Sequence, residues 1–214
     1  MNYLAHGLGA FDRPYELAGT ALPDWLRVHG VRLKAEFEAL ECSGDECAID
    51  LRRGTLRHLE QDRAFHQAEV FQRLSQRTSR RMREVVSDPY FRASFFAHVI
   101  CELLLDAEIE RVQPGTVDRY YGALEGVDPL IVERTVEGWT TAPPSGLADS
   151  IRRFREIRFL ADYGDDERLV HRVDRVAGFV GLAPLPRRIV PLVSEVRREV
   201  RKLRERLLCP ETSV

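Results

Sequence analysis

The chain has 214 residues, of which 44% are hydrophobic and 31% are charged, and its formal net charge is -2. This length and composition predict a folded domain with a sizeable core and exclude long disordered stretches. The near balance of 32 basic and 34 acidic side chains argues against a nucleic-acid or membrane partner recruited by global charge. We therefore expect one domain over residues 1–214, which recognises any charged partner through a local patch.

Two features of the sequence predict a cytoplasmic protein. The N-terminal segment has no basic leader, and no stretch reaches the roughly 18 to 20 apolar residues of a membrane span. The cysteines show neither the CxxC pairs of a zinc ribbon nor the density of a secreted scaffold, and they are Cys42, Cys47, Cys101 and Cys209. We expect reduced thiols and assign the first two of them no role.

Helical signals dominate the chain in sequence order. The first part predicts a short broken helix, a second short helix, a loop and a brief extended piece, over 15–30, 32–40, 41–47 and 48–51. Apolar residues then recur at helical spacing and predict two long central helices, over about 55–85 and 89–112. Further helices are expected over 116–124, 129–139, 147–162, 165–178 and about 186–208. The predicted fold class is all-α, a single helical bundle.

Chemistry-bearing side chains lie in two rows on the two long central helices. On the first helix an i, i+4 spacing stacks three potential ligands on one face, and they are His58, Asp62 and His66. The second helix repeats this spacing inside an apolar segment, with His98, Glu102 and Asp106. Burial of an unpaired carboxylate is costly. Two facing rows that bind shared divalent cations would account for the polar residues on both helices. The pattern predicts a metal site between the central helices.

Mixed imidazole and carboxylate donors also indicate which chemistry such a site supports. They suit Mn, Fe, Zn or Ni, and an open coordination position would bind a phosphate oxygen and lower the pKa of a bound water. Taken one at a time, these residues have an ordinary structural explanation, as a solvated helix face, a hydrogen-bonded core histidine and an arginine-paired glutamate. The matching spacing on two helices favours the metal site. His29 and His171 lie outside both rows and are expected to be ordinary surface or hydrogen-bonded histidines.

Four stretches of the chain resemble the motifs of one known family. Two of them are Met1-Asn2-Tyr3-Leu4-Ala5-His6, similar to Met-Asn-Phe-Leu-Ala-His, and Gly19-Thr-Ala-Leu22-Pro-Asp24-Trp25, similar to Gly-x-x-Leu-x-Asp-Phe. The others are Gly54-x-x-x-His58-x-x-x-Asp62-x-x-x-His66, similar to Gly-x-x-x-His-x-x-x-Asp-x-x-x-Asp, and His98-x-x-x-Glu102, where the family has Asp-x-x-x-Asp followed by His. The sequence thus resembles the acyl carrier protein phosphodiesterases, also called ACP hydrolyases, which have an HD-like all-helical fold.

The resemblance implies a particular reaction and a set of site residues. In that family 4'-phosphopantetheine is released from the serine of holo acyl carrier protein, within fatty acid biosynthesis, with manganese or magnesium. Carried over by position, the metal ligands would be His6, Asp24, His58, Asp62, His66, His98 and Glu102. Catalysis would rest on Asp24, His58, Asp62 and His66, with His58 or His66 protonating the leaving serine oxygen. The chain departs from the family at His66, His98, Glu102 and Leu103, which changes the charge of the metal shell.

The expected partner is an acidic acyl carrier protein. Arginines on the final helix, together with Arg152, Arg153, Arg155 and Arg158, offer complementary charge, although an ordinary solvated helix face explains them equally well. Two other functions stay open at this point. One is an HD-like phosphohydrolase that acts on a nucleotide or small phosphate ester, and the other is a non-catalytic helical interaction protein whose site has degenerated. The oligomeric state is open.

Overall fold

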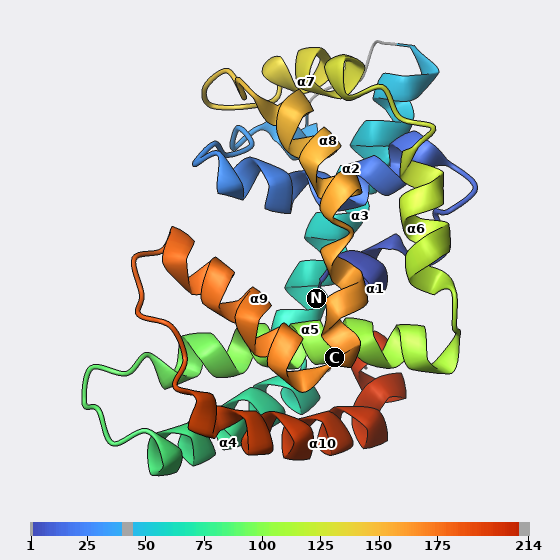
Figure 1. Ribbon diagram of the computed structural model, residues 1–214. Helices are drawn as coiled ribbons and strands as arrows, with labels where there is room; N and C mark the ends of the chain where they lie inside the picture. Colours follow the sequence, from blue (N-terminus) through green and yellow to red (C-terminus); the bar gives the residue numbers. More distant parts are fainter. Residues whose placement is uncertain (1, 40–44, 210–214) are drawn as a thin grey trace. The chain divides into compact units, whose positions relative to one another are not determined.

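The computed structural model of the chain describes residues 2–39 and 45–209, and these are helical almost throughout (Figure 1). The α-helices are α1 (Tyr3–Gly7), α2 (Pro14–Val28), α3 (Glu46–Gln67), α4 (Glu69–Val85), α5 (Ala93–Val112), α6 (Thr116–Leu124), α7 (Pro129–Glu137), α8 (Leu147–Ile157), α9 (Asp166–Phe179) and α10 (Val190–Leu208). The 3-10 helices are η1 (Phe37–Ala39), η2 (Phe159–Gly164) and η3 (Arg187–Ile189). No strand occurs in these two ranges, so the all-α prediction is confirmed. Within them no helix has the length and apolar character needed to cross a membrane.

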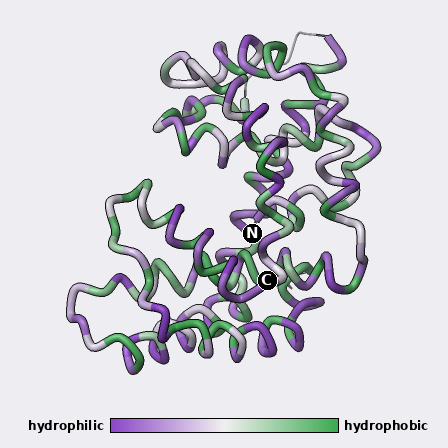
Figure 2. Tube along the Cα trace, viewed as in Figure 1, coloured by the Kyte–Doolittle hydropathy of each residue, from purple (hydrophilic) through white to green (hydrophobic). Residues whose placement is uncertain are grey.

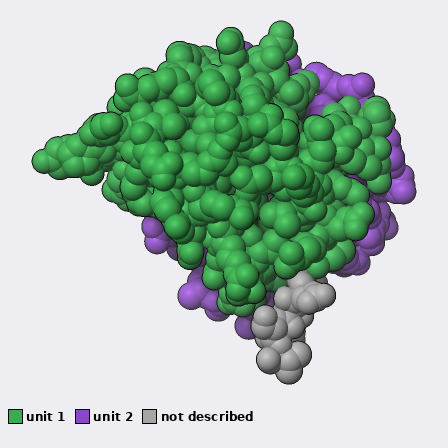
Figure 3. Space-filling view, turned by 90° about the horizontal axis from the view of Figure 1, so that it is seen from below, with its two compact units in different colours: residues 1–5, 62–114, 159–214 green, residues 6–61, 115–158 purple. Residues whose placement is uncertain are grey.

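Contacts between residues divide the chain into two compact units, coloured separately in Figure 3. Unit 1 comprises residues 1–5, 62–114 and 159–214, and unit 2 comprises residues 6–61 and 115–158. This division does not test the expectation of a single domain over 1–214, which stays a prediction. Cys42 and most of the predicted loop over 41–47 lie outside the described residues.

Helix α5 forms the centre of unit 1. It packs against α4, α9, α10 and η2, and residues on all its sides are buried, among them Phe96, Ile100, Leu104 and Ile109. A helix that is apolar all round belongs inside a protein, which agrees with its position. By contrast, α10 buries one stripe, and Figure 2 shows hydrophobic and hydrophilic residues alternating along it. The polar side chains of α5 therefore find their hydrogen-bond and ion-pair partners among the elements packed around it.

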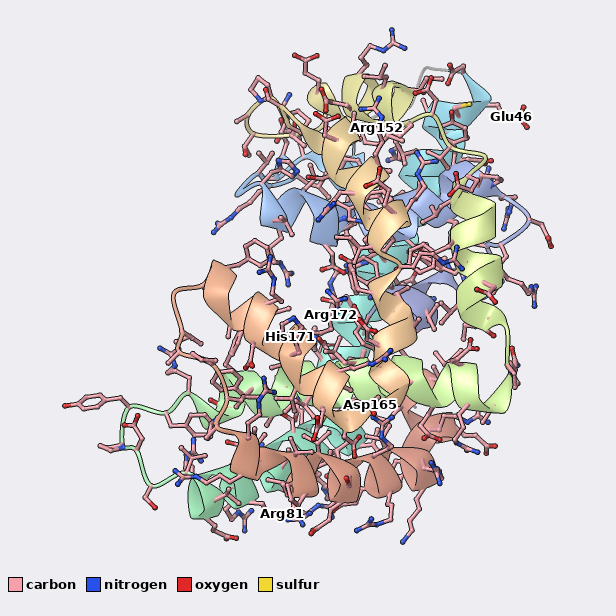
Figure 4. All side chains as sticks on the ribbon, viewed as in Figure 1. Glu46, Arg81, Arg152, Asp165, His171 and Arg172 are labelled. Carbon is pink, nitrogen blue, oxygen red and sulfur yellow. The ribbon has the colours of Figure 1, made fainter. Side chains whose placement is uncertain are left out.

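Ion pairs join the outer helices of unit 1 on their polar faces. On α4, Arg81, which is labelled in Figure 4, pairs with Glu195 and Glu199 of α10. Arg77 of the same helix reaches Glu199 at 2.7 Å. The buried Glu108 of α5 accepts hydrogen bonds from Arg111 at 2.6 Å and from Arg201 of α10. Pairing is what makes a buried carboxylate tolerable. These contacts fix α4, α5 and α10 as one block.

Asp106, the last member of the second predicted row, anchors the N-terminal helix. Its buried carboxylate accepts hydrogen bonds from the backbone N–H groups of Leu4 at 2.9 Å and Ala5 at 3.0 Å. A carboxylate at this place satisfies donors that the first turn of a helix leaves unpaired. Asp106 thus holds the start of α1, the helix that carries His6.

Replacement of Asp106 by alanine is expected to destabilise the protein by about 3 kcal/mol, because two buried N–H donors lose a charged acceptor. The measurement is urea unfolding followed by circular dichroism. Asp149→Ala is the matched control, since that carboxylate is 85% exposed and should change the free energy of unfolding by less than about 0.5 kcal/mol. Equal effects of the two substitutions would contradict the anchoring role.

In unit 2, α2 and α3 cross at two glycines with almost no space between their backbones. A Cβ atom on Gly54 would lie 1.9 Å from the Glu16 carbonyl oxygen, and one on Gly19 would lie 2.1 Å from that of Leu51. Glycine is therefore required at both positions for the helices to approach this closely. Beside the crossing, the buried Glu16 carboxylate of α2 forms ion pairs with Arg13, just before α2, at 2.9 Å, and with two arginines of α3, Arg53 at 3.5 Å and Arg57 at 3.3 Å.

Two predictions for the first fifty residues are wrong. The segment 48–51 is helical rather than extended, because α3 begins at Glu46 and the Asp45 carboxylate accepts a hydrogen bond from the Ala48 N–H at 2.9 Å, as N-cap residues do. The expected helix over 32–40 is reduced to the short η1. Leu33 instead forms an isolated bridge with Thr140, and this pairing competes with a helix.

The predicted helix over 55–85 is two helices, because Ala68 between α3 and α4 has an extended backbone, with φ -65° and ψ 125°. No Gly or Pro marks this position. The rings of Phe65 and Phe71 on either side of it pack together with centroids 4.2 Å apart, and all three residues are buried. Burial of the two aromatic side chains offsets the interrupted helical hydrogen bonds.

The helix predicted over 147–162 is also shorter than expected. It ends as α8 at Ile157, because Arg158 takes the left-handed conformation with φ 49°. Such a backbone is unfavourable for a residue with a Cβ atom. The Arg158 guanidinium is held by Asp118 at 2.6 Å and lies over the Tyr121 ring at 4.8 Å, which compensates for the strained turn.

Candidate metal centre

Unit 1 brings together four of the seven residues predicted as metal ligands. Asp62 and His66 come from α3, and His98 and Glu102 come from α5. The His66 ring lies between two carboxylates, with Nδ1 3.2 Å from Asp62 Oδ2 and Nε2 2.9 Å from Glu102 Oε1. His98 Nε2 lies 3.1 Å from the same Glu102 oxygen. Glu102 therefore joins the two imidazoles.

The donor atoms of this cluster lie close enough to share one ion. His66, His98 and Glu102 each offer a ligand atom, and these three atoms all lie within 4.8 Å of one another. Ligand atoms bound at about 2.0–2.2 Å from one divalent ion are separated by roughly 3–4 Å, so the side chains need only a small adjustment. With 16% to 40% of each side chain exposed, water can reach the cluster. The residues present fit a divalent metal.

Aromatic rings form one wall of the cluster. The Phe71 ring meets the His98 ring edge-on with centroids 5.0 Å apart, and it lies 5.5 Å from the His66 ring. The two imidazoles are themselves 4.7 Å apart at an angle of 31°. Packing against a ring restricts the orientations of both histidines and excludes water from that side. The break at Ala68 is what turns Phe71 towards the cluster.

Hydrogen bonds and charges within the cluster shift two pKa values in opposite directions. The pKa of His66 is raised to about 9 by its hydrogen bonds to Asp62 and Glu102, which outweigh its partial burial. Burial opposes ionisation of Glu102, yet nearby positive charge and hydrogen bonds from His66 and His98 hold its pKa well below its usual range. Without metal, the cluster at neutral pH is a protonated His66 between two carboxylates.

The raised pKa predicts how the stability of the metal-free protein depends on pH. The folded-state pKa of His66 is about 9 and the unfolded value is about 6.5, so its protonation stabilises the fold fully below about pH 6.5. This contribution is lost as the pH rises from about 6.5 through 9. In the presence of a chelator, the urea midpoint should fall more over this window for the wild-type protein than for His66→Gln. An identical fall in both proteins would contradict the shift.

Unit 2 brings together two further predicted ligands, His6 and His58. Both side chains are buried, and their rings stack with centroids 4.0 Å apart and 28° between their planes. His58 Nδ1 lies 2.8 Å from the Thr20 carbonyl oxygen, and His6 Nδ1 lies 3.0 Å from Gln61 Oε1. Because a backbone carbonyl oxygen only accepts, Nδ1 of His58 carries the proton and its Nε2 carries the lone pair. Metal-binding histidines are oriented in the same way.

The glycine crossing explains why His58 reaches Thr20. Gly54 precedes His58 by one turn of α3, and Gly19 is adjacent to Thr20 on α2, so the close backbone approach brings the imidazole within reach of the carbonyl. Asp24 lies one turn further along α2, just after Pro23, and its carboxylate pairs with Arg27 at 3.9 Å. That all seven residues form one site stays a prediction.

The two histidines outside the rows have ordinary environments, as expected. His29 Nε2 lies 2.9 Å from Ser150 Oγ, and His171 is exposed on α9 (Figure 4). Sequence reasoning missed Thr20, Gln61 and Phe71, which position the predicted ligands. Thr20 and Gln61 offer a backbone carbonyl and a neutral amide, groups that no ligand pattern marks.

The fold and the cluster define an all-α protein with a candidate centre for a divalent metal. Comparisons with models of protein families, with curated proteins and with solved structures found no match. The likeness to the acyl carrier protein phosphodiesterases is therefore carried by the sequence motifs alone.

Proposed function

We propose that this chain is a metal-dependent phosphodiester hydrolase. The observation that carries the proposal is the convergence of Asp62, His66, His98 and Glu102 from α3 and α5 within unit 1. Two imidazoles and the Glu102 carboxylate, partly exposed, are a donor set that binds a transition metal and leaves positions for a substrate, while Asp62 lies on the Nδ1 side of His66. A bound metal supplies a Lewis acid for the phosphate oxygens and lowers the pKa of a water.

The donor set also favours particular metals. Imidazole nitrogen suits Fe, Zn and Ni, and Mn binds it in sets mixed with carboxylates, whereas Mg keeps to oxygen ligands. Of the manganese and magnesium that the family resemblance implies, the pair His66 and His98 therefore favours manganese. The buried pair His6 and His58 of unit 2 has the same preference.

The residues of the chain have distinct roles in the proposed reaction. Glu102 holds both imidazoles through one oxygen and keeps its negative charge, because its pKa is lowered. Asp62 fixes the orientation of His66 from the other side, as a carboxylate does in other histidine pairs. With a metal bound, His66 would be a neutral ligand through Nε2, and its remaining proton would stay at Nδ1 towards Asp62. Each of these roles depends on the other residues of the cluster.

The substrate that the sequence resemblance supports is holo acyl carrier protein, an acidic protein. Several arginines of α10 are engaged inside unit 1, since Arg197 pairs with Asp166 at 2.6 Å and Arg201 with Glu108 at 3.2 Å. An exposed basic row at i, i+4 spacing continues along this helix, and it consists of Arg198, Lys202 and Arg206. Such a row complements an acidic partner.

Replacement of all three residues of this basic row by glutamine is expected to raise KM for holo acyl carrier protein about tenfold at low salt. Hydrolysis of a small phosphodiester should be unchanged, because the row takes no part in the chemistry. Steady-state kinetics with both substrates measure the difference. An unchanged KM for the protein substrate would contradict docking on α10.

The direct test of the proposed function is hydrolysis by the purified wild-type protein, reconstituted separately with Mn, Fe and Zn. Bis(4-nitrophenyl) phosphate reports phosphodiester cleavage, and 4-nitrophenyl phosphate reports monoester cleavage. We expect metal-dependent cleavage of the diester and release of 4'-phosphopantetheine from holo acyl carrier protein. Preference for the monoester, or for a nucleotide, would favour the alternative phosphohydrolase, and no cleavage with any metal would contradict an enzyme.

One observation favours a second candidate function, a non-catalytic helical interaction protein. The protonated His66 pairs with both Asp62 and Glu102, so the carboxylates are satisfied by side chains of the chain itself. A degenerated site would keep such ion pairs for stability. Metal binding distinguishes the two functions, because a structural ion-pair cluster has no affinity for added metal at low micromolar concentration.

A further inference from the structure

Unit 1 contains a polar hollow of about 330 Å³ that is separate from the candidate metal centre. Five of its lining residues come from α4 and one from the start of α5, and they are Ser75, Gln76, Ser79, Arg80, Arg83 and Ser94. Three hydroxyls, an amide and two guanidinium groups make it rich in hydrogen-bond donors, and no carboxylate lines it. This composition suits an anion with several oxygens.

The positive charge of the hollow is not neutralised by neighbouring side chains. Other arginines of α4 have acidic partners, since Arg73 pairs with Glu69, and Arg77 and Arg81 pair with glutamates of α10. Arg80 and Arg83 form no ion pair with any residue in the ranges 2–39 and 45–209. Two uncompensated guanidinium groups at one hollow attract an anion.

The hydroxyl of Ser79 is an independent indication of a ligand. Ser79 is only 4% exposed, lines the hollow, and its Oγ has no hydrogen-bond partner among the described residues. Buried hydroxyls are normally satisfied by protein or by a bound molecule. Serines within a helix often bond to the preceding turn, and this one does not. Its hydroxyl is therefore an unsatisfied donor in the wall of the hollow.

The first turn of α5 also favours binding of an anion in the hollow. Ser94 lies in the first turn of this helix of 20 residues, where backbone N–H groups have no acceptor within the helix and the helix dipole is positive. Phosphate groups bind at such positions in many proteins. Ser94 also precedes His98 by one turn, a separation of roughly 6 Å, so an occupant would lie beside the candidate metal centre.

We propose that this hollow is a phosphate-binding site, in which Arg80 and Arg83 supply the charge and Ser79 and Ser94 supply hydroxyl donors. The occupant is a phosphate dianion, either free orthophosphate or the phosphate group of a larger molecule. Both sources present the same oxygens to the same donors. The site does not depend on the proposed hydrolytic function.

Isothermal titration of the purified full chain with inorganic phosphate tests the proposal, with and without a chelator. We expect saturable binding that persists in the chelator and weakens at least about tenfold in Arg80→Ala and in Arg83→Ala. Ser79→Ala should weaken binding about threefold or more. Arg73→Ala is the matched control, because it removes one positive charge from the same helix but not from the hollow, and binding should be unchanged.

Several results would overturn the proposal. They are the absence of saturable binding at millimolar phosphate, loss of binding in the chelator, and equal weakening by Arg73→Ala and Arg80→Ala. Circular dichroism of each variant shows whether it is folded, and Arg80→Lys keeps the charge for a variant that is not. Titration with methyl phosphate separates the two sources, since binding equal to that of inorganic phosphate supports a phosphate group on a larger molecule, and much weaker binding supports free orthophosphate.

Discussion

Replacement of Glu102 by glutamine is expected to lower phosphodiester hydrolysis about a thousandfold. The substitution keeps the size of the side chain but removes the negative charge that both His66 and His98 contact through one oxygen. Loss of a charged ligand removes several kcal/mol of metal-dependent stabilisation of the transition state, and each 1.4 kcal/mol corresponds to tenfold in rate. The value of kcat/KM for bis(4-nitrophenyl) phosphate, measured at saturating manganese, checks the expectation.

His171→Gln is the control for this experiment, because that histidine is exposed on α9 and lies outside both ligand rows. Its activity should equal that of the wild-type protein within a factor of two or so. If Glu102→Gln retained wild-type activity while folded, the reaction would not use the cluster of α3 and α5. A decrease in His171→Gln of the same size would point to a general effect on the fold.

Replacement of Gly54 by alanine is expected to destabilise the protein by about 3 kcal/mol or more. The new Cβ atom would lie 1.9 Å from the Glu16 carbonyl oxygen, and because this is a backbone atom, α2 and α3 must move apart. For a chain of this length the loss corresponds to a decrease in Tm of roughly 6–12 °C. Differential scanning calorimetry measures it. The contact between His58 and Thr20 should weaken in the same variant.

The same change from glycine to alanine at Gly122 is expected to stabilise the protein. Gly122 lies within α6, and a Cβ atom there would meet nothing within 4 Å. Alanine should stabilise this helix by about 0.5–1 kcal/mol, because glycine loses more backbone freedom on folding. A loss of stability in Gly122→Ala, or none in Gly54→Ala, would contradict the packing of unit 2.

Periodicity alone was sufficient to predict the helices that are bounded by clear signals. The helix expected over 116–124 has these bounds, and the one expected over 129–139 begins as predicted and ends two residues earlier, at Glu137. Gly115 and the pair Asp128 and Pro129 mark where they begin. The i, i+4 spacing correctly placed Asp62 with His66, and His98 with Glu102, on shared helix faces. Spacing within a helix is local, so a sequence can reveal it without knowledge of the fold.

Features that depend on tertiary packing could not be predicted. The interruption at Ala68 has no local signal, since it results from the contact between Phe65 and Phe71 across the break. Asp106 continues the spacing of His98 and Glu102 but binds the backbone of Leu4 and Ala5, more than 100 positions away in sequence. Which partner a buried carboxylate finds is decided by the neighbouring elements, which the sequence pattern does not specify.

The measurement that tests the metal centre most directly is the metal content of the purified protein by inductively coupled plasma mass spectrometry. Wild type, Glu102→Gln, His66→Ala and the control His171→Ala are purified identically and reconstituted with manganese before desalting. We predict near-stoichiometric transition metal in the wild type and in His171→Ala, and its loss in Glu102→Gln and His66→Ala. Absence of metal from the wild type after reconstitution, or equal metal in all four proteins, would contradict a metal centre at these residues.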